Sequence, residues 1–118
     1  MDTESKLQEG IELHRNGQLQ QAELIYQQIL QVNPENAEVL HLLGTIAHQV
    51  EKYDLAINLI NQAIEIDPNQ SSFFNNLGLT LQKRGRCEEA VQAYKQAIDL
   101  NSDSSESYYN LGITLNDQ

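Results

Sequence analysis

Residues 40–68 read LHLLGTIAHQVEKYDLAINLINQAIEIDP, and this stretch decides the fold. Its apolar residues recur at the three- and four-residue spacing of an amphipathic helix. The first stripe is Leu40, Leu43, Ala47 and Val50. After a polar interval the second stripe is Tyr53, Ala56, Leu59, Ile60, Ala63 and Ile64. The stretch closes on Pro68, which cannot continue a helix. It therefore predicts two helices joined by a short turn.

The same pattern recurs along the whole chain when the sequence is shifted by 34 residues. Glycine recurs at Gly10, Gly44, Gly78 and Gly112, and alanine at Ala22, Ala56 and Ala90. A large side chain recurs at Tyr26, Ile60 and Tyr94. A fixed period of this length is the signature of a repeat architecture. The repeats are expected at 3–36, 37–70 and 71–104, with a partial repeat at 105–118.

The 34-residue register also predicts where each helix begins and ends. Asn36 and Ser104 are expected N-caps, because their side-chain oxygens can accept from the first free backbone N–H groups. The pattern contains no strand, so the chain is expected to be one all-α domain, residues 1–118, with seven helices. The expected spans are 3–15, 19–31, 37–49, 53–65, 71–83, 87–99 and 105–116.

The repeated glycines lie inside the first helix of each unit. Glycine in a helix interior costs about 1 kcal/mol relative to alanine, so its recurrence needs a reason. The expected reason is close approach of the second helix, which a Cβ would block. The predicted small partners on that helix are Ala22, Ala56 and Ala90.

Composition limits the class of partner. The 118 residues include 7 Lys and Arg against 17 Asp and Glu, a formal net charge of −10. This balance opposes binding to nucleic acid, which needs a basic surface, and to anionic membranes. Cys87 is the only cysteine and fits a reducing compartment. The N-terminus does not resemble a signal peptide, and a cytoplasmic location is expected.

The repeated residues resemble the tetratricopeptide repeat, a 34-residue motif of two helices. The second unit carries the motif as Leu40, Leu43, Gly44, Ala47, Ala56, Ile60, Ala63 and Pro68. Ser102 replaces the proline in the third unit, Lys6 and Glu9 depart in the first, and the fourth stops after one helix. The resemblance implies a right-handed superhelical stack of antiparallel helix pairs.

The resemblance also implies that the first helices line a concave groove that binds a peptide or protein segment. Amides there would bond to a peptide backbone and apolar residues would take side chains. The expected groove residues are Leu7, Gln8, Ile11, His14, Arg15, His41, Leu42, Thr45, His48, Gln49, Asn75, Asn76, Leu79, Gln82, Lys83, Tyr109, Asn110 and Ile113.

All three histidines fall on this stripe, and two uses compete with ordinary solvent exposure. A metal site is one, but a separation of seven positions between His41 and His48 is too large for two ligands of one ion, and no metal is expected. A partner contact that depends on pH is the other, because histidine titrates near neutral pH.

Two asparagines, Asn76 and Asn110, lie 34 residues apart. The pair is similar to the asparagine ladder in the repeat region of O-linked N-acetylglucosamine transferases, which holds the substrate backbone. Gln8 and Leu42 occupy the matching places in the earlier units, so the alternative of ordinary polar groove residues stays open.

Some tetratricopeptide co-chaperones clamp a C-terminal carboxylate with basic residues. The matching places here hold no Lys or Arg: they are Leu7, Ile11, Leu42, Ser72 and Asn76. The sequence therefore argues against such a clamp.

The last helix keeps the pattern of an internal helix, although no second helix follows it. Gly112 would then lack its packing partner. Two hypotheses follow: the sequence is part of a longer array, or the exposed edge pairs with another chain to form a homo-oligomer. The expected edge residues are Tyr108, Leu111 and Leu115.

No phosphate-binding loop, nucleophile–base pair or metal-spaced Cys/His set occurs in the sequence. We therefore expect no enzyme activity and no cofactor, and a protein-interaction scaffold with a protein or peptide partner. The alternatives are a substrate-recruiting arm of a larger glycosyltransferase-like enzyme and a module that assembles with itself.

Overall fold

The computed structural model describes residues 2–117. This part of the chain forms seven α-helices and no strand, as predicted. Four of the helices end one residue later than expected, and the other three match. Their bounds are α1 (Thr3–Arg15), α2 (Leu19–Val32), α3 (Ala37–Gln49), α4 (Tyr53–Ile66), α5 (Ser71–Lys83), α6 (Cys87–Leu100) and α7 (Ser105–Asp117).

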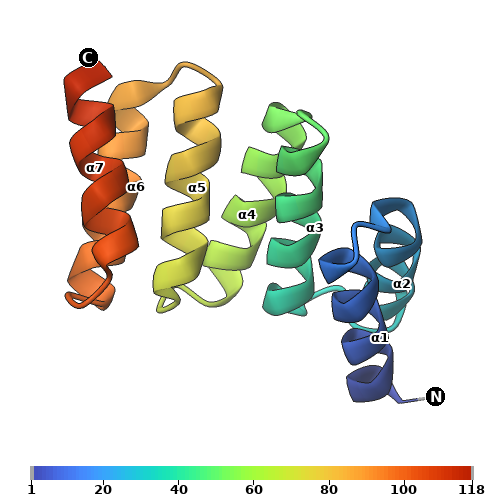
Figure 1. The fold of residues 1–118 in the computed structure, drawn as a ribbon. Coiled ribbons are helices and arrows are strands. Elements are labelled where there is room, and N and C mark those ends of the chain that lie inside the picture. The colour runs from blue at the N-terminus through green and yellow to red at the C-terminus, as the bar shows by residue number, and fades with distance from the viewer. Residues whose placement is uncertain (1, 118) are drawn as a thin grey trace.

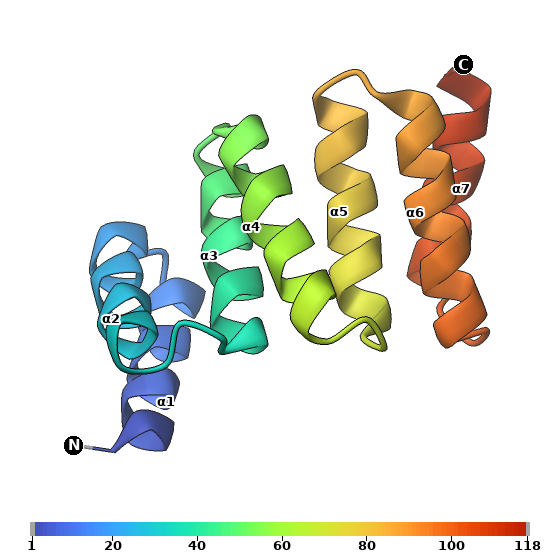
Figure 2. The same cartoon turned by 180° about the vertical axis from the view of Figure 1, so that it is seen from behind.

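The helices stack as antiparallel pairs into an elongated right-handed superhelix of 46 × 26 × 22 Å. Figure 1 shows α1, α3, α5 and α7 on the near face, with the second helices behind them. Figure 2, from behind, brings α2, α4 and α6 to the front. We call these two sides the first-helix face and the second-helix face. The predicted architecture is confirmed.

Both expected N-caps form. Asn36 Oδ1 accepts from the backbone N–H of Val39 at 3.1 Å, and Ser104 Oγ accepts from that of Ser107 at 3.2 Å. The turn within each unit needs one residue in the left-handed region. That residue is Gly17 (φ 83°), Glu51 (φ 64°) or Gly85 (φ 87°), each 34 residues from the next. The repeat therefore fixes backbone conformation as well as packing.

The mid-helix glycines are sites of close approach, as expected, but their nearest neighbours are large side chains of the second helix and not the expected alanines. A Cβ on Gly10 would lie 2.6 Å from the ring of Tyr26, and one on Gly78 would lie 2.5 Å from the ring of Tyr94. At Gly44 the neighbour is Ile60, at 2.6 Å. The large residue of the second helix covers the glycine, and the three alanines are fully buried in the core. At Gly44 the carbonyl oxygen of Ala56 also lies close, 3.4 Å from the Cβ position.

Candidate functional site on the first-helix face

The first-helix face holds the expected groove residues at three levels of exposure. His41 and Asn75 are buried, with 9% and 7% of their surface exposed. The sequence predicts both on the open groove. They are buried instead, because the first helix of the next repeat covers them. The exposed ones are Gln8, Arg15, Gln49, Lys83, Tyr109 and Ile113. The part-buried ones are Leu7, Ile11, His14, Leu42, Thr45, His48, Asn76, Leu79, Gln82 and Asn110.

One row of polar residues links each first helix to the next near the helix C-termini. His14, His48 and Gln82 are spaced by 34 residues, and we call them the helix-end row. His14 Nε2 lies 2.6 Å from Gln49 Oε1, and His48 Nδ1 lies 2.8 Å from Thr80 Oγ1. Thr114 Oγ1 lies 3.0 Å from Gln82 Oε1. Each rung ties one repeat to its successor.

A second row lies nearer the helix N-termini and consists of His41 and Asn75, again 34 residues apart. His41 Nε2 lies 2.7 Å from Asn76 Nδ2, so it accepts from that amide. Asn75 Oδ1 accepts from Asn110 Nδ2 at 3.3 Å and from Ser107 Oγ at 3.1 Å. We call this the helix-start row. Asn76 and Asn110, the two asparagines 34 residues apart, therefore each bond to the preceding first helix. The sequence did not predict this role.

The signal for these rungs was present in the sequence. Each polar residue of a row has a polar residue between 32 and 35 positions further on. That is the separation of facing positions on neighbouring first helices. Polar pairs at this separation indicate both rows. The position of the same side chains on the groove stripe predicts contacts with a bound partner instead.

Burial favours the neutral form of His41 and of His48. It lowers the pKa of His41 to about 4. It also lowers the pKa of His48, with a smaller contribution from the positive charge of Lys83. Burial disfavours the charged form of an imidazole because it removes the water that would solvate the charge. A neutral imidazole has one donor and one acceptor nitrogen, so each ring can bridge two neighbours.

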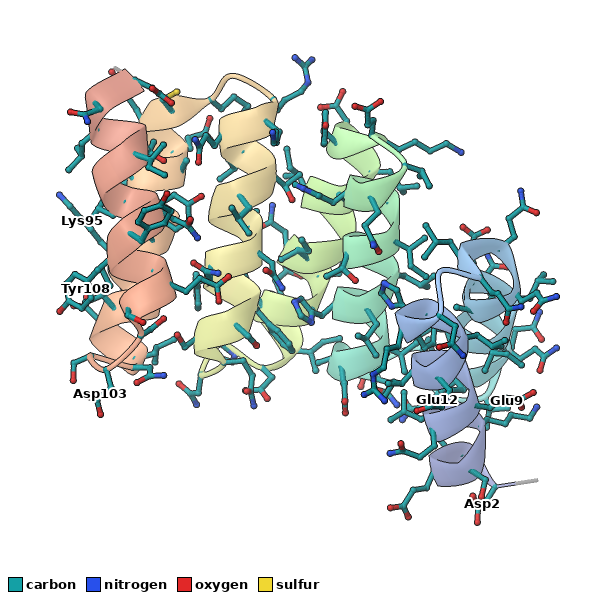
Figure 3. All side chains as sticks on the ribbon, in the orientation of Figure 1. Asp2, Glu9, Glu12, Lys95, Asp103 and Tyr108 are labelled. Carbon is teal, nitrogen blue, oxygen red and sulfur yellow. The ribbon has the colours of Figure 1, made fainter. Side chains whose placement is uncertain are left out.

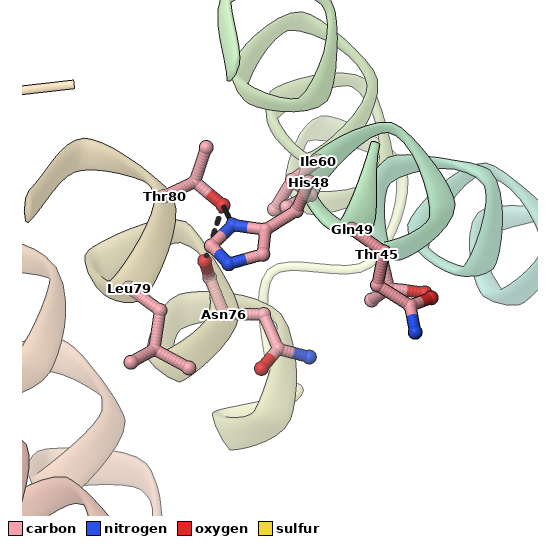
Figure 4. A pocket seen from close by; sticks show the side chains of 7 residues that line it. All are labelled: Thr45, His48, Gln49, Ile60, Asn76, Leu79 and Thr80. Carbon is pink, nitrogen blue, oxygen red and sulfur yellow. Dashed lines mark hydrogen bonds between the residues drawn. The ribbon is translucent and has the colours of Figure 1, made fainter. Parts of the chain in front are cut away.

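A small pocket opens on the first-helix face between α3 and α5 (Figure 4). Its volume is about 100 Å³. Ile60 and Leu79 supply apolar walls, and His48, Asn76 and Thr80 supply polar atoms. Thr45 and Gln49 complete the lining. Three expected groove residues of α3 thus meet two of α5 around one cavity.

The outer side of α7 is open. Tyr108 and Leu115 expose 50% and 49% of their surface, and a Cβ on Gly112 would meet no atom of residues 2–117 within 4 Å. Tyr108 points away from the rest of the stack in Figure 3. Leu111 is partly buried and packs on the core beneath. The expected edge residues therefore divide into two that face outward and one that holds α7 in place.

The structure gives no cluster that would hold a metal ion: within residues 2–117, no three His, Cys, Asp or Glu side chains come together. Cys87 is a half-buried free cysteine. None of the helices described is long and apolar enough to cross a membrane.

Three family models of the tetratricopeptide repeat match this chain, over residues 13–75, 59–92 and 81–118. The first of these covers more than half of the sequence. The chain belongs to the tetratricopeptide repeat family. It contains three full repeats and the first helix of a fourth, as expected from the 34-residue register. A search of curated proteins gave no match.

Solved structures of the same fold are numerous. A mutant of the Thermobaculum terrenum O-GlcNAc transferase is 30% identical with a TM-score of 0.93, over 96% of this chain and 22% of that one. MamA from Desulfovibrio magneticus RS-1 is 23% identical with a TM-score of 0.87, over 96% of this chain and 64% of that one. The first tetratricopeptide domain of Spaghetti (RPAP3), bound to an HSP90 peptide, is 16% identical with a TM-score of 0.93, over 98% and 91%. This tetratricopeptide chain thus spans less than two thirds of the transferase and of MamA.

Proposed function

We propose that this tetratricopeptide protein is an interaction scaffold that binds an extended peptide segment along its first-helix face. The observation that carries the proposal is the chemistry of that face. None of the expected groove residues is a carboxylate, although the chain has 17 Asp and Glu. Amides, imidazoles, hydroxyls and apolar side chains line it, with Arg15 and Lys83 as the only charged residues of the expected groove. Such a surface can bond to a peptide backbone and enclose side chains without repelling either.

The Spaghetti domain supports the proposal because its structure contains a bound peptide and its fold is the same. The mode of capture should differ from a carboxylate clamp. No Lys or Arg stands at the places that such a clamp requires, which hold Leu7, Ile11, Leu42, Ser72 and Asn76. We therefore propose an internal segment of the partner, held by its backbone and side chains.

The test is selection of binders from a random peptide library displayed against the 118-residue protein. Groove variants should remove accessible side chains and leave the inter-repeat hydrogen bonds intact. Leu79→Ala and Tyr109→Ala meet this condition, since neither side chain has a hydrogen bond within residues 2–117. Gln92→Ala, an exposed position on α6, is the matched control. Selected peptides should bind the two groove variants several-fold more weakly and the control unchanged. Equal binding to all four proteins would refute the first-helix face as the site.

A second candidate is a recruiting arm of a larger glycosyltransferase-like enzyme. The observation in its favour is the similarity to the Thermobaculum terrenum transferase, which covers only 22% of that protein. Sequencing the gene on both sides of these 118 codons decides it. An adjoining transferase domain would support the arm, and its absence would exclude it.

A third candidate is self-association through α7. Its support is the open face of Tyr108 and Leu115, which together expose apolar surface at the end of the stack. Sedimentation across a wide concentration range should then show a dimer that Leu115→Lys abolishes. A monomer at every concentration would exclude it. A cytoplasmic location stays a prediction from composition.

A further inference from the structure

The pocket between α3 and α5 has a polar wall whose protons are positioned by their neighbours. Thr80 Oγ1 donates to the carbonyl oxygen of Asn76 at 3.0 Å and also lies 2.8 Å from His48 Nδ1. A hydroxyl has one proton to donate and can still accept. With that proton bonded to the Asn76 carbonyl, Thr80 must accept from His48. This arrangement favours a proton on Nδ1 of His48.

The other ring nitrogen, His48 Nε2, is then an acceptor. In Figure 4 it is turned away from Thr80, towards the side of the pocket where Leu79 and Asn76 lie. No side chain within residues 2–117 donates to it, and no unbonded side-chain nitrogen or oxygen is sealed from solvent in that range. Nε2 is thus open to an incoming group.

Asn76 adds a second acceptor to the same pocket. Its Nδ2 is bonded to His41 Nε2 at 2.7 Å, which fixes the orientation of the amide. The structure gives its Oδ1 no donor among the residues it describes. The pocket therefore presents two acceptors beside the apolar walls of Leu79 and Ile60.

We propose that this pocket receives a hydroxyl-bearing side chain, serine or threonine, from the segment bound along the first-helix face. The hydroxyl would donate to His48 Nε2, and the methyl group of a threonine would lie against Leu79 and Ile60. The proposal rests on the proposed function, since it names the chemistry of one subsite of that groove. A cavity of about 100 Å³ suits a side chain of this size.

The competing side chains fit less well. A carboxylate would place acceptor atoms against His48 Nε2 and Asn76 Oδ1, with no proton between them. A valine would match threonine in shape but would strip water from His48 Nε2 and leave it unbonded, which is costly. The imidazole stays an acceptor at neutral pH, because burial and then the charge of Lys83 lower the pKa of His48. The ring of Tyr53 packs edge-on against the His48 ring, with 5.4 Å between the ring centroids.

The first experiment needs no ligand. Long-range ¹H–¹⁵N NMR of the imidazoles in the free protein reports which nitrogen of each ring carries the proton. His48 should be protonated on Nδ1 at neutral pH. Thr80→Val, which keeps the shape of the side chain and removes the acceptor, should release this preference. A His48 ring protonated on Nε2 in the wild-type protein would overturn the proposal.

The second experiment uses capped alanine pentapeptides that carry threonine, serine, valine or aspartate at the centre, titrated into ¹⁵N-labelled protein. The threonine peptide should shift the amides of α3 and α5 and bind about tenfold more tightly than the valine peptide, the value of one buried hydrogen bond. The preference should shrink in Thr80→Val. Binding with valine or aspartate equal to threonine would overturn the subsite and leave the groove standing. Peptides that shift only the second-helix face, or nothing, would overturn the groove as well.

Discussion

The third repeat and the final helix carry the same pattern in different surroundings. Gly78 in α5 lies under the ring of Tyr94, whereas Gly112 in α7 has no neighbour within 4 Å of its missing Cβ. Leu81 is 4% exposed, and its counterpart Leu115 is 49% exposed. The repeat therefore determines where each residue lies on its helix, and the adjacent helix determines what that residue contributes to stability.

The largest expected effect is at the enclosed glycine. Gly78→Ala would place a methyl group 2.5 Å from a buried ring that has no exposed surface. The gain of about 1 kcal/mol in helix propensity is smaller than the cost of displacing the ring. We expect a net loss of about 3 kcal/mol in the free energy of unfolding, measured by urea denaturation. A variant as stable as the parent would show that Tyr94 moves freely and would break the comparison.

The enclosed position of the helix-start row should make stability depend on pH. The folded pKa of His41 is about 4, below its ordinary value of 6.5. Above pH 6.5 the histidine is neutral in the folded and the unfolded chain, and its full contribution to the free energy of unfolding is present. As the pH falls from 6.5 to 4, the unfolded chain takes up the proton first. The loss over this range should be about 2 to 3 kcal/mol.

The chain supplies a matched control for this titration. Asn75 occupies the same place one repeat later, so His41→Asn puts a non-titrating amide where the repeat already accepts one. This variant should lose less stability between pH 6.5 and 4 than the parent, as measured by urea denaturation at each pH. Identical pH profiles would mean that His41 is not enclosed in solution. The equivalent residue in α7, Tyr109, is 69% exposed and offers no such burial.

At the open end of the stack the glycine substitution should act in the opposite direction. Gly112→Ala adds a methyl group that meets nothing, so only helix propensity changes. We expect a gain of about 1 kcal/mol in the 118-residue chain. A loss of stability here would indicate that another helix covers α7 in solution, through self-association. Sedimentation of the same variant would show whether that is the case.

The fold could be predicted from the sequence almost to the residue, because 34-residue spacing and helical periodicity are local and repeated. Two features of the site could not. His41 and Asn75 look like groove residues in a helical projection, but the adjacent repeat buries them. The alanines looked like the partners of the glycines, although the ring of Tyr94 lies closer to Gly78. Both errors concern contacts between helices, which a pattern within one helix does not contain.

The smallest expected effect on stability is at the turn inside each repeat, where no neighbouring helix is involved. Gly17, Glu51 and Gly85 hold the same left-handed turn, and nothing lies within 4 Å of the missing Cβ of either glycine. The backbone alone therefore favours glycine at this place, in an outer repeat as much as in an inner one. A side chain in this region costs about 1 to 2 kcal/mol, partly offset because glycine gains more freedom on unfolding.

Glu51→Gly should accordingly raise the free energy of unfolding by about 0.5 to 1 kcal/mol. The reciprocal change, Gly85→Glu, should lower it by a similar amount. Gly17→Glu should match Gly85→Glu, although one turn lies in the first repeat and the other in the third. Urea denaturation of the three variants tests this. Unequal losses at Gly17 and Gly85 would mean that surroundings decide the turns too. Equal losses would separate positions fixed by the backbone from those, such as Gly78 and Gly112, that depend on an adjacent helix.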